Sequence, residues 1–193
     1  MKRKLLITGF DPFGGASINP AWEAVKLLPD QIGDFEVHKL EIPTVFGLAA
    51  ETVIAKTRAV DPDVILCVGQ AGGRAAVTPE RIAVNIRDAK ISDNAGNQPV
   101  GEFVNPDGPA AYFSTVPVGE MAAAIAAAGL PGVVSNSAGA FVCNDTLYCL
   151  LQHYSGTAVK VGFIHVPYLP EQGTPSLPLK KTVAALEFAI KVC

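Results

Sequence analysis

Apolar and polar positions follow two patterns, one typical of strands and one typical of helices, which alternate along the chain. Short apolar runs, such as VILCV at 64–68, predict strands. Other segments carry apolar residues at helical spacing, and within 44–60 the side chains of Val45, Leu48 and Val53 fall on one face. Strands that alternate with helices predict an α/β fold with a mostly parallel sheet and helices on both of its faces.

The two patterns place the elements along the whole chain. Strands are expected near 4–10, 35–42, 64–70, 80–88, 132–137 and 158–166. Helices are expected near 20–28, 44–60, 119–129, 143–155 and 178–192. Asn19 followed by Pro20 marks the first helix start, because asparagine caps helices and proline suits the first turn. No repeat or linker is visible, so residues 1–193 are predicted to form a single domain.

Composition narrows the class of protein. Hydrophobic residues make up 49% and charged residues 17% of the 193 positions, which predicts a substantial buried core. The net charge is -3 and no basic run of the kind that neutralises phosphates occurs, so nucleic acid is not an expected partner.

The N-terminal segment and the cysteines bear on location. The apolar stretch after Lys4 meets Asp11 and Pro12 too soon for a signal peptide, and no run approaches the roughly 18 apolar residues of a membrane span. Four cysteines without a secretory signal do not form a disulfide framework. We therefore expect a cytoplasmic protein without a membrane partner.

Turn-forming residues fill 91–109, which predicts a long loop. Loops of this length in compact domains often serve as lids or walls of a functional site, although a plain surface loop has the same composition.

Cys143 follows the small-residue turn SAGA at 137–140, which leads from a predicted strand toward a helix. Most free cysteines are core residues, and we expect that role for Cys67 and Cys149. A thiol at a helix N-terminus is different, because the N–H groups and the helix dipole there favour thiolate and can hold an oxyanion. Cys143 is therefore the candidate nucleophile.

Three histidines compete for the role of base. His38 lies in an alternating stretch and is expected at an exposed strand position, and His153 lies late in the helix that carries Cys143. His165 ends an apolar strand directly before VPYLP at 166–170, at the sheet edge where sites of α/β proteins form. His165 is the candidate base.

Glu80 stands between Thr78-Pro79 and the apolar segment after Arg81. Its carboxylate could simply pair with Arg81 or a lysine. As the third member of a site it would accept a hydrogen bond from an imidazole and fix the imidazole tautomer. Thiol, imidazole and carboxylate together indicate a thiol hydrolase.

The other motifs give little evidence for a nucleotide or a metal site. The glycines at 9–15 lack the Lys and Ser/Thr of a phosphate-binding loop, and those at 69–73 lack GxGxxG spacing. Cys143 and Cys149 are six residues apart and no CxxC or HExxH occurs, so neither a nucleotide nor a metal is expected.

With these residues in view, the chain resembles the pyroglutamyl peptidase type I family, also called pyrrolidone-carboxylate peptidases. The similarity covers nearly the whole length. It is carried by TGFDPFGG at 8–15, GQAGGR at 69–74, TPERIAVN at 78–85, the segment before Cys143, and HVPY at 165–168.

The resemblance implies a three-layer α/β/α sandwich around a mostly parallel mixed sheet. It also implies a cysteine omega-peptidase that removes N-terminal pyroglutamate from peptides through a thioester, without metal or organic cofactor, and that assembles as a homotetramer. Cys143 would be the nucleophile, His165 the base and Glu80 its partner. The implied lactam pocket consists of Phe10, Phe13, Phe141 and Val142, with Asn19 and Gln70 as hydrogen-bonding groups.

The aromatic pair Phe10 and Phe13 suits this pocket, because both follow the first strand without an obvious helix or strand face to fill. The resemblance implies an arginine near the turn into the long loop that helps to hold the oxyanion, and Lys90 stands there in this chain. Lysine keeps the charge but loses the planar fork. A binding module that keeps the pocket without catalysis is the alternative, and retention of Cys143, His165 and Glu80 disfavours it.

Overall fold

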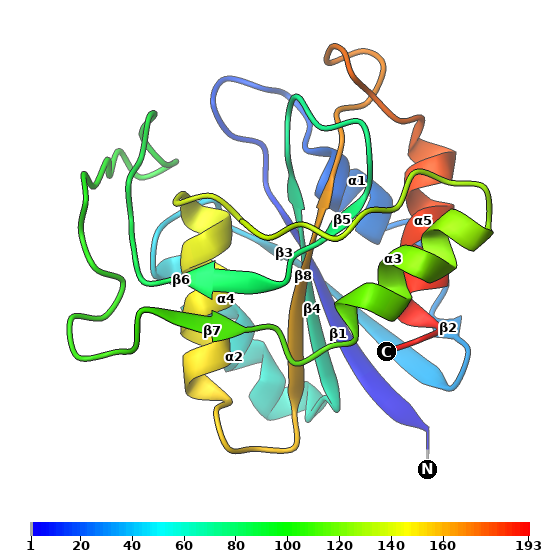
Figure 1. The fold of residues 1–193 in the computed structure, drawn as a ribbon, viewed down its shortest axis with the longest axis horizontal. Helices are drawn as coiled ribbons and strands as arrows, with labels where there is room; N and C mark the ends of the chain where they lie inside the picture. The colour runs from blue at the N-terminus through cyan, green and yellow to red at the C-terminus, as the bar shows by residue number, and fades with distance from the viewer. Residues whose placement is uncertain (1) are drawn as a thin grey trace.

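A computed structural model describes residues 2–193 and centres on one six-stranded sheet (Figure 1). The strand order across it is β2-β3-β1-β4-β8-β5. These strands are β1 (Arg3–Phe10), β2 (Gln31–Ile32), β3 (Phe35–Ile42), β4 (Val64–Gln70), β5 (Thr78–Pro79) and β8 (Lys160–Val166). The four central strands are parallel, whereas the short edge strands β2 and β5 are antiparallel to their neighbours. The mostly parallel mixed sheet is therefore confirmed.

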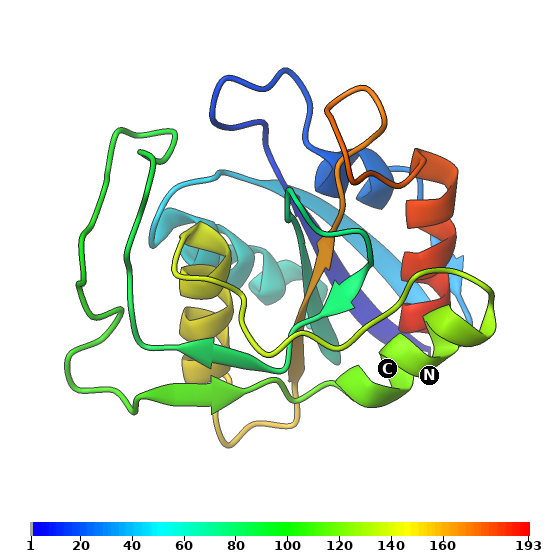
Figure 2. The ribbon, with the colours of Figure 1, turned by 45° about the horizontal axis from the view of Figure 1, so that its top comes forward.

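Helices cover both faces of the sheet. They are α1 (Pro20–Val25), α2 (Leu48–Val60), α3 (Val118–Ala127), α4 (Val142–His153) and α5 (Leu179–Ile190). Figures 1 and 2 show α2 and α4 on one face and α1, α3 and α5 on the other. Along β4, Leu66 and Val68 pack into the core of the three-helix face, and Ile65 and Cys67 into the core of the two-helix face. The predicted α/β/α sandwich is confirmed.

The prediction of one strand over 80–88 is wrong. β5 ends at Pro79, and the chain then leaves the main sheet to form β6 (Ile82–Val84), which pairs with β7 (Ala111–Phe113) in a separate two-stranded sheet. Between them, the Glu80 N–H donates to the carbonyl of Phe163 at 2.9 Å and the Arg81 N–H to that of Ser135 at 2.8 Å. Glu80 therefore lies where the chain crosses from one sheet to the other.

The strand predicted over 132–137 is also absent from the described residues. The segment makes only isolated bridges, from Gly132 to Val77 and from Ser135 to Glu80, and Val133 is 57% exposed. It runs beside the edge of the sheet rather than inside it, so its apolar residues do not mark a buried strand.

The helix predicted over 44–60 begins at Leu48 instead. Gly47 has φ of 72°, outside the right-handed helical region, so a regular helix can begin only after it. Carboxylates bind three backbone N–H groups ahead of this helix start. Thr44 donates to Asp11 Oδ1 at 2.7 Å, Phe46 to Asp93 Oδ2 at 3.0 Å and Gly47 to Asp145 Oδ2 at 2.8 Å. These contacts hold residues 44–47 as a connecting segment beside the long loop.

Among residues 2–193, none of the helices has the length and apolar character that a membrane crossing requires.

Gly9 on β1 allows α1 to lie directly against the sheet. A Cβ at this position would lie 2.6 Å from the Trp22 Cα and 2.7 Å from the Trp22 nitrogen, which are backbone atoms. Because backbone cannot rotate away, we expect Gly9→Ala to lower the free energy of unfolding by about 1–3 kcal/mol or more, as measured by urea denaturation.

Gly119 in α3 is the matched control, since a Cβ there meets no atom within 4 Å. Gly119→Ala should leave stability unchanged or raise it by up to about 1 kcal/mol. Equal unfolding midpoints for Gly9→Ala and the parent protein would contradict the close approach of α1 to β1.

Candidate active site

His165 lies near the carboxyl end of β8, where its side chain is 4% exposed. Its register partner on the parallel strand β4 is Gly69, and its antiparallel partner on β5 is Thr78. Phe163 and Val161, two and four residues earlier, pack into the core under α2 and α4. Since side chains alternate along a strand, His165 points to that same face, toward the beginning of α4.

Glu80 reaches His165 from the end of β5. Its Oε1 atom lies 2.7 Å from His165 Nδ1, and the residue is fully buried. The other carboxylate oxygen, Oε2, is buried without a hydrogen-bond partner among residues 2–193. The hydrogen bond fixes Nδ1 as the protonated ring nitrogen, which leaves the Nε2 lone pair free to accept a proton.

Cys143 lies in the first turn of α4, as the sequence predicted. Gly139, with φ of 81°, bends the chain ahead of the helix. A Cβ at Gly69 would lie 2.9 Å from the Cys143 sulfur, so the thiol rests against the strand position paired with His165. Thiol and imidazole are thus neighbours across one sheet edge, although no hydrogen bond joins them within residues 2–193.

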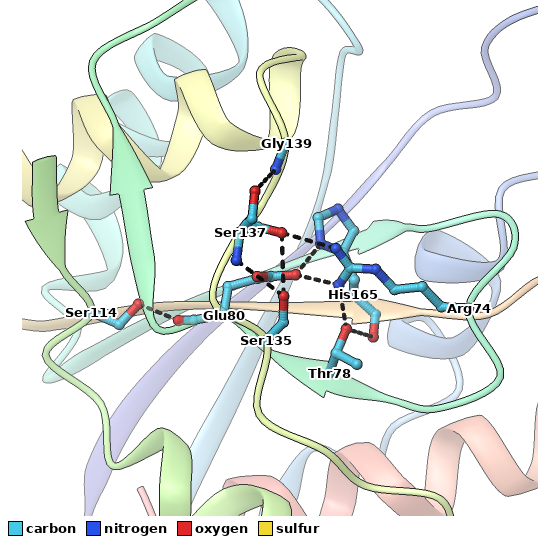
Figure 3. Close-up of polar contacts among 8 residues, drawn as sticks. All are labelled: Arg74, Thr78, Glu80, Ser114, Ser135, Ser137, Gly139 and His165. Carbon is cyan, nitrogen blue, oxygen red and sulfur yellow. Dashed lines mark hydrogen bonds and ion pairs between the residues drawn. The ribbon is translucent and has the colours of Figure 1, made fainter.

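Sequence reasoning assigned no role to Arg74, which completes the cluster shown in Figure 3. Its Nη1 atom lies 2.5 Å from Glu80 Oε1 and 2.7 Å from Thr78 Oγ1. Its Nη2 atom donates to the carbonyl oxygen of Ser137 at 2.9 Å. The sequence feature that could have indicated a role for Arg74 is its position at the end of GQAGGR, 69–74, one of the segments that carry the family resemblance.

The charges within this cluster stabilise an ionised carboxylate. Burial alone would raise the Glu80 pKa, but the hydrogen bond and charge of His165 and the hydrogen bond from Arg74 outweigh it and hold the pKa below its usual value. Burial lowers the His165 pKa, and Arg74 lowers it further, against the opposing effect of Glu80. The resting pair is therefore a carboxylate and a neutral imidazole at neutral pH.

The backbone N–H of Cys143 favours thiolate, in the direction expected for a helix N-terminus, but burial outweighs this effect in the free protein. Burial raises the pKa of the thiol to about 12, and the negative charge of Glu80 adds to the increase. Arg74 and the backbone N–H of Cys143 lower this pKa but do not offset burial. The thiol is therefore protonated at neutral pH and needs a base to react.

A cavity of about 630 Å³ opens beside this cluster. Its lining includes Phe13, Gln70, Ile91, Tyr168 and Gln172, so two predicted pocket residues and one residue of the long loop contribute to it. Gln172 Nε2 lies 3.0 Å from Gln70 Oε1 across the opening. The cavity combines an apolar wall with a few amide groups, which is typical of small-ligand sites.

An aromatic group connects the cavity to the nucleophile. The Phe13 ring centroid lies 6.0 Å from that of Phe141, and Phe141 meets Phe46 edge to face at 5.3 Å. Phe141 and the buried Val142 immediately precede Cys143. These two predicted pocket residues therefore adjoin Cys143 in the chain, and Val142 is buried in the core on the α2 and α4 side of the sheet.

The lining of this cavity does not include the remaining predicted pocket residues, Phe10, Asn19 and Lys90. Phe10 ends β1 with 1% exposure and packs on Phe163 at 6.1 Å, so the expectation that it lacks a strand face is wrong. Asn19 uses both ends of its amide on backbone, accepting from Ala21 and donating to Asp11. Lys90 is exposed.

The competing side chains do not join this cluster. His38 on β3 lies 3.2 Å from Glu36, measured from Nε2 to Oε1, and His153 is exposed at the end of α4. Cys67 is fully buried as expected, whereas Cys149 is only partly buried. Within the described part of the chain, no group of three or more His, Cys, Asp and Glu side chains is arranged to hold a metal ion.

Comparison with known proteins agrees with this geometry. A family model described as pyroglutamyl peptidase matches residues 3–193. The chain belongs to the pyroglutamyl peptidase family. Pyrrolidone-carboxylate peptidase of Levilactobacillus brevis is 55% identical over 97% of this chain and 96% of its own. The Staphylococcus saprophyticus protein of the same name is 50% identical over 97% of this chain and 92% of its own.

Solved structures of the family share the fold. Pyroglutamyl peptidase I from Bacillus amyloliquefaciens is 44% identical and superposes with a TM-score of 0.96, covering 100% of this chain and 95% of its own. Pyrrolidone carboxyl peptidase from Thermococcus litoralis is 37% identical with a TM-score of 0.93, covering 98% and 92%. These matches confirm the enzyme class predicted from the sequence, a peptidase of the pyroglutamyl peptidase family.

The raised Cys143 pKa generates a prediction for the free enzyme. Alkylation by iodoacetamide requires thiolate, so its rate at Cys143 should rise about tenfold per pH unit from pH 7 to 9 without a plateau. Peptide mapping after partial alkylation should find Cys143 modified before the fully buried Cys67. A plateau below pH 7 would instead show a resting pair of thiolate and imidazolium.

Proposed function

We propose that this protein hydrolyses the bond after an N-terminal pyroglutamyl residue of peptides. In this proposal Cys143 is the nucleophile, His165 the base and Glu80 the group that orients the base. The observation that carries the proposal is the 2.7 Å hydrogen bond from His165 Nδ1 to the buried Glu80, beside a thiol at the start of α4. Family membership supports the substrate class.

The reaction begins with a neutral thiol and a neutral imidazole. As Cys143 Sγ attacks the carbonyl carbon of the pyroglutamyl residue, its proton passes to His165 Nε2, and the ionised Glu80 stabilises the imidazolium that forms. The carbonyl oxygen becomes an oxyanion, for which the unpaired N–H groups in the first turn of α4 are suitable donors.

Collapse of this intermediate breaks the amide bond and leaves a thioester on Cys143. The proton on His165 moves to the leaving amine, which departs with the rest of the peptide. Water then attacks the thioester while His165 accepts its proton, and pyroglutamate leaves as the thiol is restored. Each proton taken up by the imidazole is returned, so the cycle requires no cofactor.

The cavity supports the proposed substrate. A pyroglutamyl ring is flat, uncharged and without a free amine, so it calls for apolar walls and a few amide contacts. Phe13 supplies such a wall, with its ring centroid 6.0 Å from that of Phe141, and Gln70 supplies an amide. Contacts with substrate stay predictions for Phe10, Asn19, Lys90, Phe141 and Val142.

We also propose that residues 1–193 act as one catalytic domain, in the cytoplasm, as a homotetramer. Four free cysteines fit a reducing compartment. Exposed apolar side chains such as Phe103, Phe113 and Val133 fit contacts between copies of the chain. Light scattering in solution measures the assembly, and a monomer would contradict the proposed tetramer.

Turnover of a chromogenic pyroglutamyl amide tests the proposed function. The parent protein should release the chromophore, and Cys143→Ser should reduce kcat/KM by roughly a thousandfold or more, because a hydroxyl is a far weaker nucleophile than a thiolate. Cys149→Ser, six residues further along α4, is the matched control and should retain most of the activity.

Two outcomes would contradict the proposal. Binding of the amide without turnover by the parent protein would favour a binding module. Substantial turnover by a folded Cys143→Ser protein would place the nucleophile elsewhere.

A further inference from the structure

Arg74 occupies a position that the chemistry proposed above leaves unexplained. Its guanidinium shares one carboxylate oxygen with the imidazole: Glu80 Oε1 lies 2.5 Å from Arg74 Nη1 and 2.7 Å from His165 Nδ1 (Figure 3). The Glu80 side chain is fully buried, whereas that of Arg74 is 31% exposed. A partly exposed guanidinium thus forms an ion pair with a carboxylate that water does not reach.

The guanidinium also joins three separate segments of the chain. It extends from the loop after β4, binds Thr78 and Glu80 at β5, and donates from Nη2 to the Ser137 carbonyl at 2.9 Å. Ser137 belongs to the turn that leads into Cys143. One side chain therefore connects the carboxylate and imidazole to the segment that carries the nucleophile.

We propose that Arg74 is a positioning residue of this site, whose charge sets the protonation of the Glu80–His165 pair and whose fork fixes the turn before Cys143. The inference rests on the proposed peptidase function, because it concerns the same thiol and imidazole.

The groups that face His165 determine how the loss of Arg74 would change the pKa of the imidazole. Glu80 approaches from β5, Arg74 from the loop after β4 and Cys143 from α4, and Cys67 on β4 lies behind the thiol. Arg74 lowers the pKa of Glu80, of His165 and of Cys143. Its removal should therefore keep the imidazole protonated to higher pH, where it cannot act as a base.

The two parts of the inference require different features of the side chain. Any cation at this place would keep the imidazole neutral, but only a planar fork reaches Glu80 and Ser137 together. Lysine should therefore preserve the electrostatic effect and lose the fixed turn, whereas glutamine should lose both.

The experiment is the pH dependence of kcat/KM for a pyroglutamyl amide, measured for the parent protein and for Arg74→Gln, Arg74→Lys and Arg81→Gln. We expect Arg74→Gln to move the acid limb upward by about half a pH unit or more. Arg74→Lys should keep the acid limb of the parent and lower kcat roughly tenfold, because the nucleophile is less well placed. Arg81 is exposed and adjacent to Glu80 in sequence, so Arg81→Gln removes the same charge and should change neither quantity.

An unmoved acid limb in a folded Arg74→Gln protein would overturn the electrostatic part. If that variant does not fold, an upward shift in Arg74→Lys would overturn it instead, because the charge is still present. Parent-like kcat in Arg74→Lys would overturn the positional part. A parent protein without turnover would refute the proposed function itself, so the two failures are distinguishable.

Discussion

Ionising a carboxyl group that water does not reach costs free energy. Glu80 is such a group, because it is fully buried at the point where the chain leaves the main sheet. Its charge persists because the imidazole of His165 and the guanidinium of Arg74 meet on one of its oxygens. Removing one member of such a buried group typically costs about 3–5 kcal/mol. The orientation of His165, its free Nε2 and its readiness to take a proton all follow from this one shared oxygen.

The nucleophile is held in place by the two residues that follow it. The buried side-chain amide of Asn144 accepts the backbone N–H of Val84 at 2.9 Å and donates to the backbone carbonyl of Val84 at 2.8 Å. Asp145 pairs with Arg87 Nε at 2.6 Å and accepts the Gly47 N–H at 2.8 Å. The first turn of α4 is thus bound to β6 and to the start of α2. The chain segment that passes from β5 to β6 therefore places Glu80 against His165 and also provides the contacts on β6 that hold the first turn of α4.

Much of this arrangement is visible in the sequence. A thiol after a small-residue turn and a histidine at the end of an apolar strand are local patterns, and parallel strands bring their carboxyl ends together. The catalytic candidates Cys143, His165 and Glu80 could therefore be chosen from residue type and position. The family resemblance extended the choice to the pocket, where Phe13 and Gln70 line the cavity as expected.

The rest depends on tertiary structure. The role of Arg74 depends on partners from two other segments of the chain, Thr78 with Glu80 and Ser137, which no spacing reveals. The sign of the Cys143 pKa shift was missed because burial of the sulfur outweighs the helix terminus, and burial is a property of the fold. Residues 132–137 look like a strand although they only flank one, and Phe10 ends β1 inside the core although no strand face for it was visible in the sequence.

The protonation state of the His165 ring tests the central claim most directly. Nitrogen NMR of the ring across a pH titration reports both its tautomer and its pKa. The account predicts a neutral ring at pH 7 with the proton on Nδ1, bonded to Glu80, and a pKa below the usual value near 6.5. A ring that is protonated on both nitrogens at pH 7, or that carries its single proton on Nε2, would contradict it.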